Sequence, residues 1–255
     1  MRIMIIRHGD PDYTVDSLTP EGFRQAECLG ERLRAARISR VYVSPLGRAR
    51  ATADTALKGT GLTYEVLPWL EEFRGRAYDA FRGVMRIPWD LKHDQWYGEK
   101  GFQDRDGWAD AGYLEGTNVR QVWEETKAGL DRVLSGNGYT REGDMYRCAP
   151  GGNDLTLVFV CHFGVGTAMT AHLTGLPVLP LWQGTCMLPS AVNILLSEER
   201  DPGLASFRCV TFGDLTHLYM KAVAPSWHGM YPERYNNVDS TDPTKWPAPG
   251  RDLRQ

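Results

Sequence analysis

Two histidines stand where apolar runs of the sequence end. Arg7 and His8 follow the first run, residues 2–6. His162 follows a longer run, residues 155–161. Such runs are typical of buried strands in a parallel sheet, and ligands bind beyond the carboxyl ends of these strands. Each histidine alone is explained as well by a structural role in a loop, but together they predict one crevice lined by two imidazoles.

An arginine follows a third short strand pattern, residues 40–43. The segment Ser44-Pro-Leu-Gly-Arg48 then opens a helical pattern, with Arg48 in its first turn. The positive end of a helix dipole favours anions, and two guanidiniums can hold a phosphoryl group through paired hydrogen bonds. Arg7 and Arg48 therefore indicate a phosphate site. Of Arg48 and Arg50, one is expected to be an exposed cation on the helix.

The elements that must position these residues predict an α/β fold. Strands are expected over residues 2–6, 40–43, 63–67, 155–160, 191–196 and 207–212, and helices over residues 20–36, 46–57, 118–134 and 164–174. The alternation of strands and helices in the first part favours parallel strands joined by crossover helices. We expect a three-layer sandwich: a mostly parallel central sheet, helices on both faces, and a helical and aromatic insertion.

Composition divides the chain into regions of a single domain, residues 1–255. The core is expected over residues 1–75 and 154–222, the insertion over residues 76–153, and a proline-rich tail over residues 223–255 that runs over the surface. The insertion contains several tryptophans and tyrosines. These rings either cover an apolar or aromatic part of a substrate or only pack the insertion against the core.

Charge and cysteine usage exclude several classes. A net charge of -3 argues against a general nucleic-acid or membrane-surface binder. No apolar run approaches the ~18 residues that span a bilayer. The five cysteines are widely spaced without a Cys-x-x-Cys pair, which disfavours a disulfide framework or a zinc site and favours a reducing cytoplasm. No metal and no cofactor is expected, and the oligomeric state is left open.

Four segments together resemble the histidine phosphatase superfamily, also called phosphoglycerate mutase-like. They are Arg7-His8-Gly9, Ser44-Pro-Leu-x-Arg-Ala-x-x-Thr-Ala53, Val160-Cys-His162 and Phe212-Gly-Asp-Leu-Thr-His-Leu218. The resemblance implies that His8 attacks phosphorus and forms a phosphohistidine, and that Arg7, Arg48 and His162 hold the phosphoryl oxygens. It implies a metal-independent reaction on a small phosphate ester.

The family also uses an acidic residue after the third strand. Glu72 fits the family spacing best, and Glu71 is the alternative; Glu72 would protonate the leaving oxygen and later activate water. Asp10 is expected to orient His8 or nearby backbone. His217 is expected to be structural, and His93, His172 and His228 are given no role.

The sequence departs from the family pattern at two places. Asp10-Pro-Asp-Tyr13 replaces the residues that often contact phosphate or substrate after the first histidine, which disfavours recognition of phosphoglycerate. Phe163 replaces a glycine after the second histidine and predicts a narrower or more apolar pocket. A phosphomonoesterase is the preferred hypothesis. A phosphoglycerate-mutase-type phosphotransferase and a non-catalytic phosphate-binding protein on the same fold are the alternatives.

Overall fold

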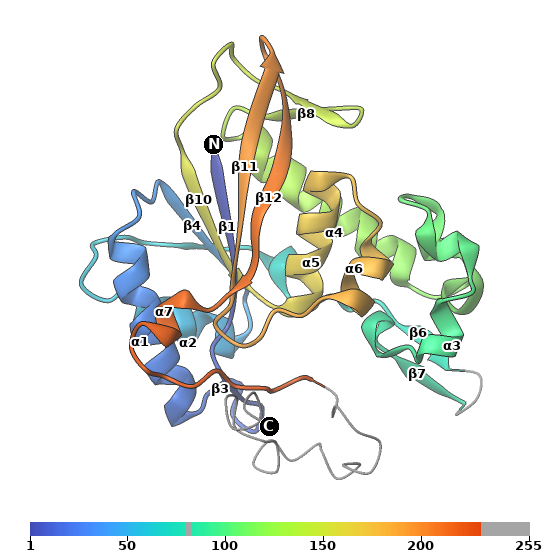
Figure 1. The fold of residues 1–255 in the computed structure, drawn as a ribbon, viewed down its shortest axis with the longest axis horizontal. Helices are drawn as coiled ribbons and strands as arrows, with labels where there is room; N and C mark the ends of the chain where they lie inside the picture. Colours follow the sequence, from blue (N-terminus) through green and yellow to red (C-terminus); the bar gives the residue numbers. More distant parts are fainter. Residues whose placement is uncertain (80–82, 231–255) are drawn as a thin grey trace, which may run out of the picture.

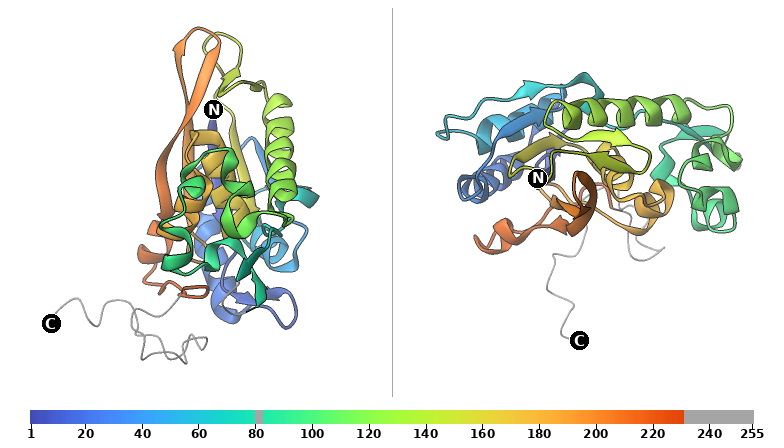
Figure 2. Two further views of the ribbon diagram at one scale, coloured as in Figure 1. Left: turned by 90° about the vertical axis from the view of Figure 1, so that its right-hand side faces the viewer. Right: turned by 90° about the horizontal axis from the view of Figure 1, so that it is seen from above.

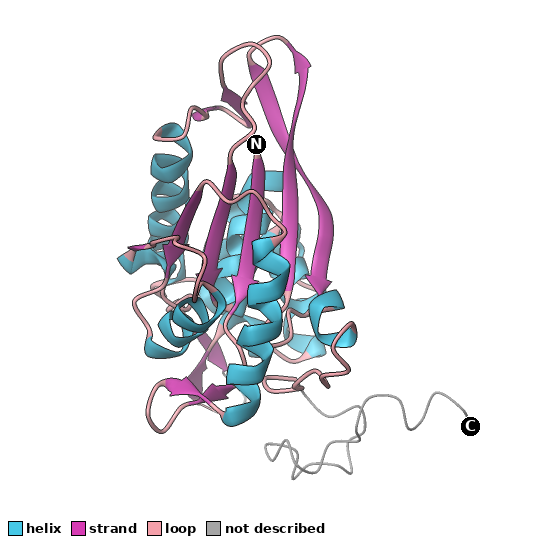
Figure 3. Cartoon of the chain, turned by 90° about the vertical axis from the view of Figure 1, so that its left-hand side faces the viewer, coloured by secondary structure: helices cyan, strands magenta, loops and turns pink. Residues whose placement is uncertain are grey.

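A single eight-stranded sheet forms the centre of the computed structural model, which describes residues 1–79 and 83–230 (Figure 1). The strand order is β5-β4-β10-β1-β11-β12-β9-β8. The strands are β1 (Arg2–Arg7), β4 (Arg40–Val43), β5 (Glu65–Val66), β8 (Thr140–Glu142), β9 (Met145–Arg147), β10 (Thr156–Cys161), β11 (Val192–Asp201) and β12 (Leu204–Asp214). Helices cover both faces of the sheet (Figure 3), so the expected α/β class is confirmed.

Parallel and antiparallel pairing divide the sheet into two halves. β5, β4, β10 and β1 are parallel neighbours. β11 runs antiparallel to β1, and β12, β9 and β8 continue the antiparallel pairing. The turn between β11 and β12 is short, so these strands need no crossover helix. The parallel order predicted from the sequence therefore applies to the half that carries the site.

Alternating side chains of β1 pack against helices on opposite faces of the sheet. Met4 and Ile6 belong to one buried cluster with residues of α1 (Pro20–Arg34) and α2 (Gly47–Ala56). Ile3 and Ile5 belong to another with residues of α4 (Val119–Ser135) and α5 (Phe163–Thr174). This alternation follows from the period of two in a strand, and it gives the expected three layers.

The segment 76–153, treated above as an insertion, contributes to two parts of the molecule. Its later half supplies α4 to the core and β8 and β9 to the sheet. Residues 77–79 and 83–114 form a lobe beyond α5 and α6 (Val178–Gly184), on the side away from α1 and α2 (Figures 1 and 2). The lobe contains β6 (Ala77–Asp79), β7 (Val84–Arg86), α3 (His93–Trp96) and 3-10 turns at Pro88–Asp90, Lys100–Gln103, Gly107–Asp110 and Gly112–Leu114.

Several tryptophans of this lobe and of α4 pack inward. Trp108 is fully buried and its ring lies 5.7 Å from that of Trp123 and 5.3 Å from that of Trp182. These rings therefore pack the insertion against the core, which is one of the two roles considered for the aromatic residues. Trp89 is only half-buried and belongs to the site described below.

Smaller elements complete the described chain. A short ribbon of β2 (Pro11–Asp12) and β3 (Ser17–Leu18) precedes α1, and a 3-10 turn at Pro68–Leu70 follows β5. The third expected strand, residues 63–67, is reduced to the two residues of β5 at the sheet edge. The chain continues through α7 (Thr216–Tyr219). Within residues 1–79 and 83–230, no helix combines the length and apolar character needed to cross a membrane.

The start of the expected tail does not run freely over the surface. Residues 225–230 fold back over the carboxyl end of β1, where Ser226 donates a hydrogen bond to Asp10 and the His228 carbonyl accepts one from Arg7. Long-range polar contacts, which composition does not reveal, hold this stretch in place. Residues 231–255 lie outside the described residues.

Candidate active site

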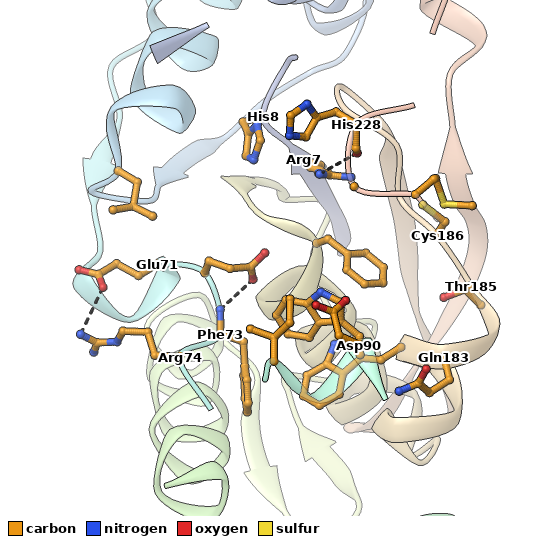
Figure 4. Close-up of a pocket in the computed structure, with 18 of the residues that line it drawn as sticks. Arg7, His8, Glu71, Phe73, Arg74, Asp90, Gln183, Thr185, Cys186 and His228 are labelled. Atoms are coloured by element: carbon orange, nitrogen blue, oxygen red, sulfur yellow. Dashed lines mark hydrogen bonds and ion pairs between the residues drawn. The ribbon is translucent and has the colours of Figure 1, made fainter. Parts of the chain in front are cut away.

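A cavity of about 1030 Å³ opens beyond the carboxyl ends of β1, β4 and β10 (Figure 4). Arg7 and His8 lie at one end of it, and Arg48 and Glu72 also line it. The rest of the wall includes Phe73, Trp89, Phe163, Trp182 and residues 228–230. His162 lies behind this surface, with its ring centroid 5.1 Å from that of His8. The structure thus brings the predicted residues together.

Hydrogen bonds fix the orientation and tautomer of His8. Its Nδ1 lies 2.7 Å from the carbonyl oxygen of Gly9, which can only accept, so Nδ1 carries the proton. Its Nε2 accepts from Nε of Arg48 at 3.3 Å. Burial and the nearby charges of Arg7 and Arg48 lower the pKa of His8 well below its usual value. The imidazole is therefore neutral, with its lone pair on Nε2.

His162 is oriented by a serine of the Ser-Pro-Leu segment. Nε2 of His162 lies 2.7 Å from Oγ of Ser44, and the same Oγ accepts from the backbone N–H of Leu46 at 3.3 Å. The hydroxyl proton of Ser44 can be donated to Nε2, in which case the ring proton of His162 lies on Nδ1. This Nδ1 is buried and has no hydrogen-bond partner among the described residues. As a donor it would be open to a ligand beside His8.

Arg7 is held by two backbone carbonyls. Its Nη1 donates to Met187 at 2.6 Å and its Nη2 donates to His228 at 3.3 Å. Its buried Nε has no hydrogen-bond partner in the described part of the chain. The two hydrogen bonds hold the guanidinium in place, and its Nε–H is left without a protein partner.

Arg48 is held by the loop between β2 and β3. The sequence pattern does not predict that this loop reaches the site. Its Nη1 pairs with Oδ1 of Asp16 at 2.6 Å, and its guanidinium lies 5.2 Å from the ring centroid of Tyr13. The second oxygen of Asp16 accepts from the backbone N–H of Gly47 at 2.7 Å. A Cβ on Gly47 would collide with the Asp16 carbonyl, so glycine permits this close approach.

The two candidate acids differ in their surroundings. Oε1 of Glu72 accepts from the backbone N–H groups of Phe73 at 2.8 Å and Val165 at 3.1 Å. Burial raises the pKa of Glu72, and these N–H groups offset part of the shift. Glu71 instead forms an ion pair with Arg74 at 3.3 Å (Figure 4). Of the two, Glu72 has the environment of a proton donor.

Asp10 is occupied by structural contacts. Its carboxylate accepts from the hydroxyls of Thr19, at 2.7 Å, and Ser226. These contacts join the turn after β1 to the start of α1 and to the segment 225–230, which matches the backbone-orienting role expected from the sequence.

The remaining histidines separate into one near the site and three elsewhere. His228, given no role above, lines the cavity with its ring centroid 5.2 Å from that of Tyr13 (Figure 4). His217 contacts Ser190 at 2.8 Å. His172 contacts Asp131 at 3.0 Å, and His93 stacks on Tyr97 outside the cavity. No signal in the sequence separates His228 from the others, because its place depends on how the tail folds back.

Metal-binding geometry is not found in the part of the chain that the structure describes. Within residues 1–79 and 83–230, no three His, Cys, Asp or Glu side chains are grouped as metal ligands would be. The charged groups around His8 that could hold an anion are arginines.

The parallel half-sheet carries two imidazoles and two guanidiniums at its carboxyl edge, a group of side chains that could hold an anion. The chain belongs to the histidine phosphatase superfamily (branch 1), which it matches over residues 3–210. An adenosylcobalamin/alpha-ribazole phosphatase of Salmonella typhi is 27% identical over 192 residues, which cover 71% of this chain and 84% of that protein.

Solved structures share the fold at lower sequence identity. A mycobacterial glucosyl-3-phosphoglycerate phosphatase superposes with a TM-score of 0.56 at 22% identity, covering 83% of this chain and 98% of that one. A phosphoserine phosphatase mutant of Entamoeba histolytica gives 0.56 at 14% identity, covering 85% of this chain and 98% of that one. These similar proteins are phosphatases of the same fold.

Proposed function

We propose that the protein is a metal-independent phosphomonoester hydrolase that forms a phosphohistidine on Nε2 of His8. The observation that carries this proposal is the hydrogen bonding of the His8 ring. Its proton is held on Nδ1 by the Gly9 carbonyl, so the lone pair on Nε2 faces the guanidinium that would bind the phosphoryl group. The lowered pKa keeps this nucleophile unprotonated at neutral and mildly acidic pH.

In the first step Nε2 of His8 attacks phosphorus in line with the leaving oxygen. The N–P bond forms as the P–O bond to the leaving group breaks. Arg48, Nε of Arg7 and Nδ1 of His162 donate to the three oxygens whose charge must be held in the transition state. The two unpartnered buried donors, on Arg7 and His162, support this assignment.

Glu72 gives its proton to the departing oxygen. In the second step Glu72, now a carboxylate, takes a proton from water as the water oxygen attacks phosphorus. The N–P bond breaks, phosphate leaves, and His8 and Glu72 return to their starting states. Two features of Glu72 support these roles. Its raised pKa favours a protonated carboxyl group in the resting site. Its hydrogen bond from the N-terminal turn of α5 stabilises the carboxylate once the proton has left.

We further infer a single domain that acts on a small phosphate ester in the cytoplasm. The five cysteines are free thiols, as expected in a reducing compartment. The cavity is of the size that small ligands occupy.

Phosphate release from 4-nitrophenyl phosphate in the presence of EDTA tests the hydrolase proposal. We expect turnover in EDTA, loss of that turnover in His8→Ala, and full turnover in the control His93→Ala, whose ring lies outside the cavity. Activity that EDTA abolishes and His8→Ala retains would exclude the mechanism. Discharge of the phosphoenzyme by 3-phosphoglycerate instead of water would favour the mutase alternative.

A further inference from the structure

Four aromatic rings, those of Phe73, Trp89, Phe163 and Trp182, line the cavity together with polar side chains that include Arg74, Arg76, Asp90 and Gln183. Trp89 packs edge-to-face on Phe163, with ring centroids 5.7 Å apart, and lies 5.4 Å from the ring of Trp182. Phe73 packs on the other side of Trp182 at 4.8 Å. Trp89 and Phe163 are half-buried, so part of each ring remains exposed in the cavity.

Trp89 and Glu72 meet at one glycine. A Cβ on Gly164 would collide with the edge of the Trp89 indole and would lie 2.6 Å from Oε1 of Glu72. Gly164, near the start of α5, therefore lets a ring from the lobe and the carboxylate from the core approach the same point. With Glu72 donating to the leaving oxygen, as proposed above, the group bonded to that oxygen would lie on the side of the cavity that carries Trp89.

The aromatic wall is rigid. Gln183 donates to the carbonyl of Pro88 at 2.8 Å, which fixes the turn that carries Trp89. Trp182 donates from Nε1 to the carbonyl of Gly164 at 2.9 Å, which ties α6 to the start of α5. A preformed apolar surface binds an apolar ligand without the entropy cost of ordering these side chains.

Accepting the hydrolase proposal above, we propose that Trp89 and Phe163 select substrates whose leaving alcohol is apolar or aromatic. The ring of such an alcohol packs against Trp89 and Phe163 while its oxygen faces Glu72. A leaving group rich in hydroxyls or carboxylates would lose hydration where it lies against the rings of Trp89 and Phe163, which offer it no hydrogen bonds.

Two esters of primary alcohols test the proposal, because their leaving oxygens are similar in basicity. We expect wild-type kcat/KM for 2-phenylethyl phosphate to exceed that for glycerol 3-phosphate by about tenfold or more. Trp89→Ala and Phe163→Ala should each lower this ratio about tenfold. Trp96→Ala, a tryptophan of the same lobe that does not line the cavity, is the matched control and should keep the wild-type ratio.

The wild-type ratio decides the question even if a variant fails to fold. Equal turnover of the two esters, or a preference for glycerol 3-phosphate, would overturn the proposal. So would folded Trp89→Ala and Phe163→Ala variants that keep the wild-type ratio. If neither these esters nor 4-nitrophenyl phosphate releases phosphate in a His8-dependent reaction, the hydrolase proposal itself fails, which is a distinct outcome.

Discussion

Nε of Arg48 lies 3.3 Å from Nε2 of His8, the ring atom that would attack phosphorus. The same guanidinium pairs with Asp16 through Nη1. Burial and the charge of Arg7 lower the pKa of His8, and the positive charge of Arg48 adds to this shift. Arg48 thus helps to keep the nucleophile neutral and, in the proposed mechanism, binds an oxygen of the phosphoryl group.

The position of Arg48 depends on Asp16, which leads to a first prediction. Asp16→Asn removes the charge that holds Nη1, so Arg48 should be less well ordered. We expect KM for a phosphate ester and the inhibition constant of inorganic phosphate to rise about threefold to tenfold. Glu21→Gln removes an exposed ion pair with Arg24 and is the control, with no change expected. Equal constants for Asp16→Asn and wild type would show that Asp16 does not position Arg48.

Replacing the proposed acid should affect poor leaving groups most. Glu72→Gln cannot donate a proton, so we expect kcat for an alkyl phosphate to fall about 100-fold or more. The fall in kcat/KM for 4-nitrophenyl phosphate should be much smaller, because nitrophenolate leaves without protonation and kcat/KM does not include hydrolysis of the phosphoenzyme. Glu71→Gln, next to it in sequence, removes a carboxylate that also lines the cavity but is paired with Arg74, so it should lose much less activity. A larger loss of kcat for the alkyl phosphate in Glu71→Gln than in Glu72→Gln would assign the proton-donor role to Glu71.

The pKa shifts of His8 and Glu72 predict a mildly acidic optimum. His8 must be unprotonated, and its pKa is lowered from 6.5, so the acid limb of kcat/KM lies well below that pH. Glu72 must be protonated, and its pKa is raised from 4.5, so the alkaline limb lies above that pH. Activity should therefore fall on both sides of the interval between the two shifted values.

Rates for an alkyl phosphate measured from about pH 4 to about pH 8 test this profile. Glu72→Gln should lose the alkaline limb assigned to the acid. The phosphate ester itself ionises with a pKa of about 6. This ionisation affects wild type and Glu72→Gln equally and serves as the internal reference. An unchanged alkaline limb in Glu72→Gln would assign that limb to another group.

Ser44 is predicted to act through His162. Ser44→Ala removes the hydroxyl that donates to Nε2, so the ring proton is no longer held on Nδ1. We expect kcat/KM to fall about tenfold to 100-fold, with partial recovery in Ser44→Thr, which keeps a hydroxyl. Ser135→Ala, on the exposed end of α4, is the control. Wild-type activity in Ser44→Ala would show that His162 is oriented without the serine.

The part of the site that was predictable lies on regular elements. Arg7, His8 and His162 end neighbouring parallel strands, so strand pattern alone places them at one edge of the sheet. Arg48 follows a strand paired with the same β10. Glu72 lies in an irregular segment, and its selection over Glu71 depended on the family resemblance.

The contacts that sequence pattern missed come from loops and from the tail. Asp16, Tyr13 and His228 reach the site through turns whose paths are set by long-range hydrogen bonds, such as the one between Ser226 and Asp10. The sequence also does not predict the antiparallel half of the sheet. Two successive apolar strands have the same pattern whether they pair as a hairpin or are joined by a crossover as parallel strands. Neither periodicity nor composition reports such contacts.

Chemical trapping of the phosphoenzyme tests the central claim most directly. The protein is mixed with a phosphate ester, quenched with alkali, and mapped by mass spectrometry of its peptides. We predict an alkali-stable, acid-labile phosphoryl group on His8, absent in His8→Asn and accumulating in Glu72→Gln when a nitrophenyl ester is used. A phosphoryl group on any other residue, or undiminished turnover by His8→Asn, would contradict the account.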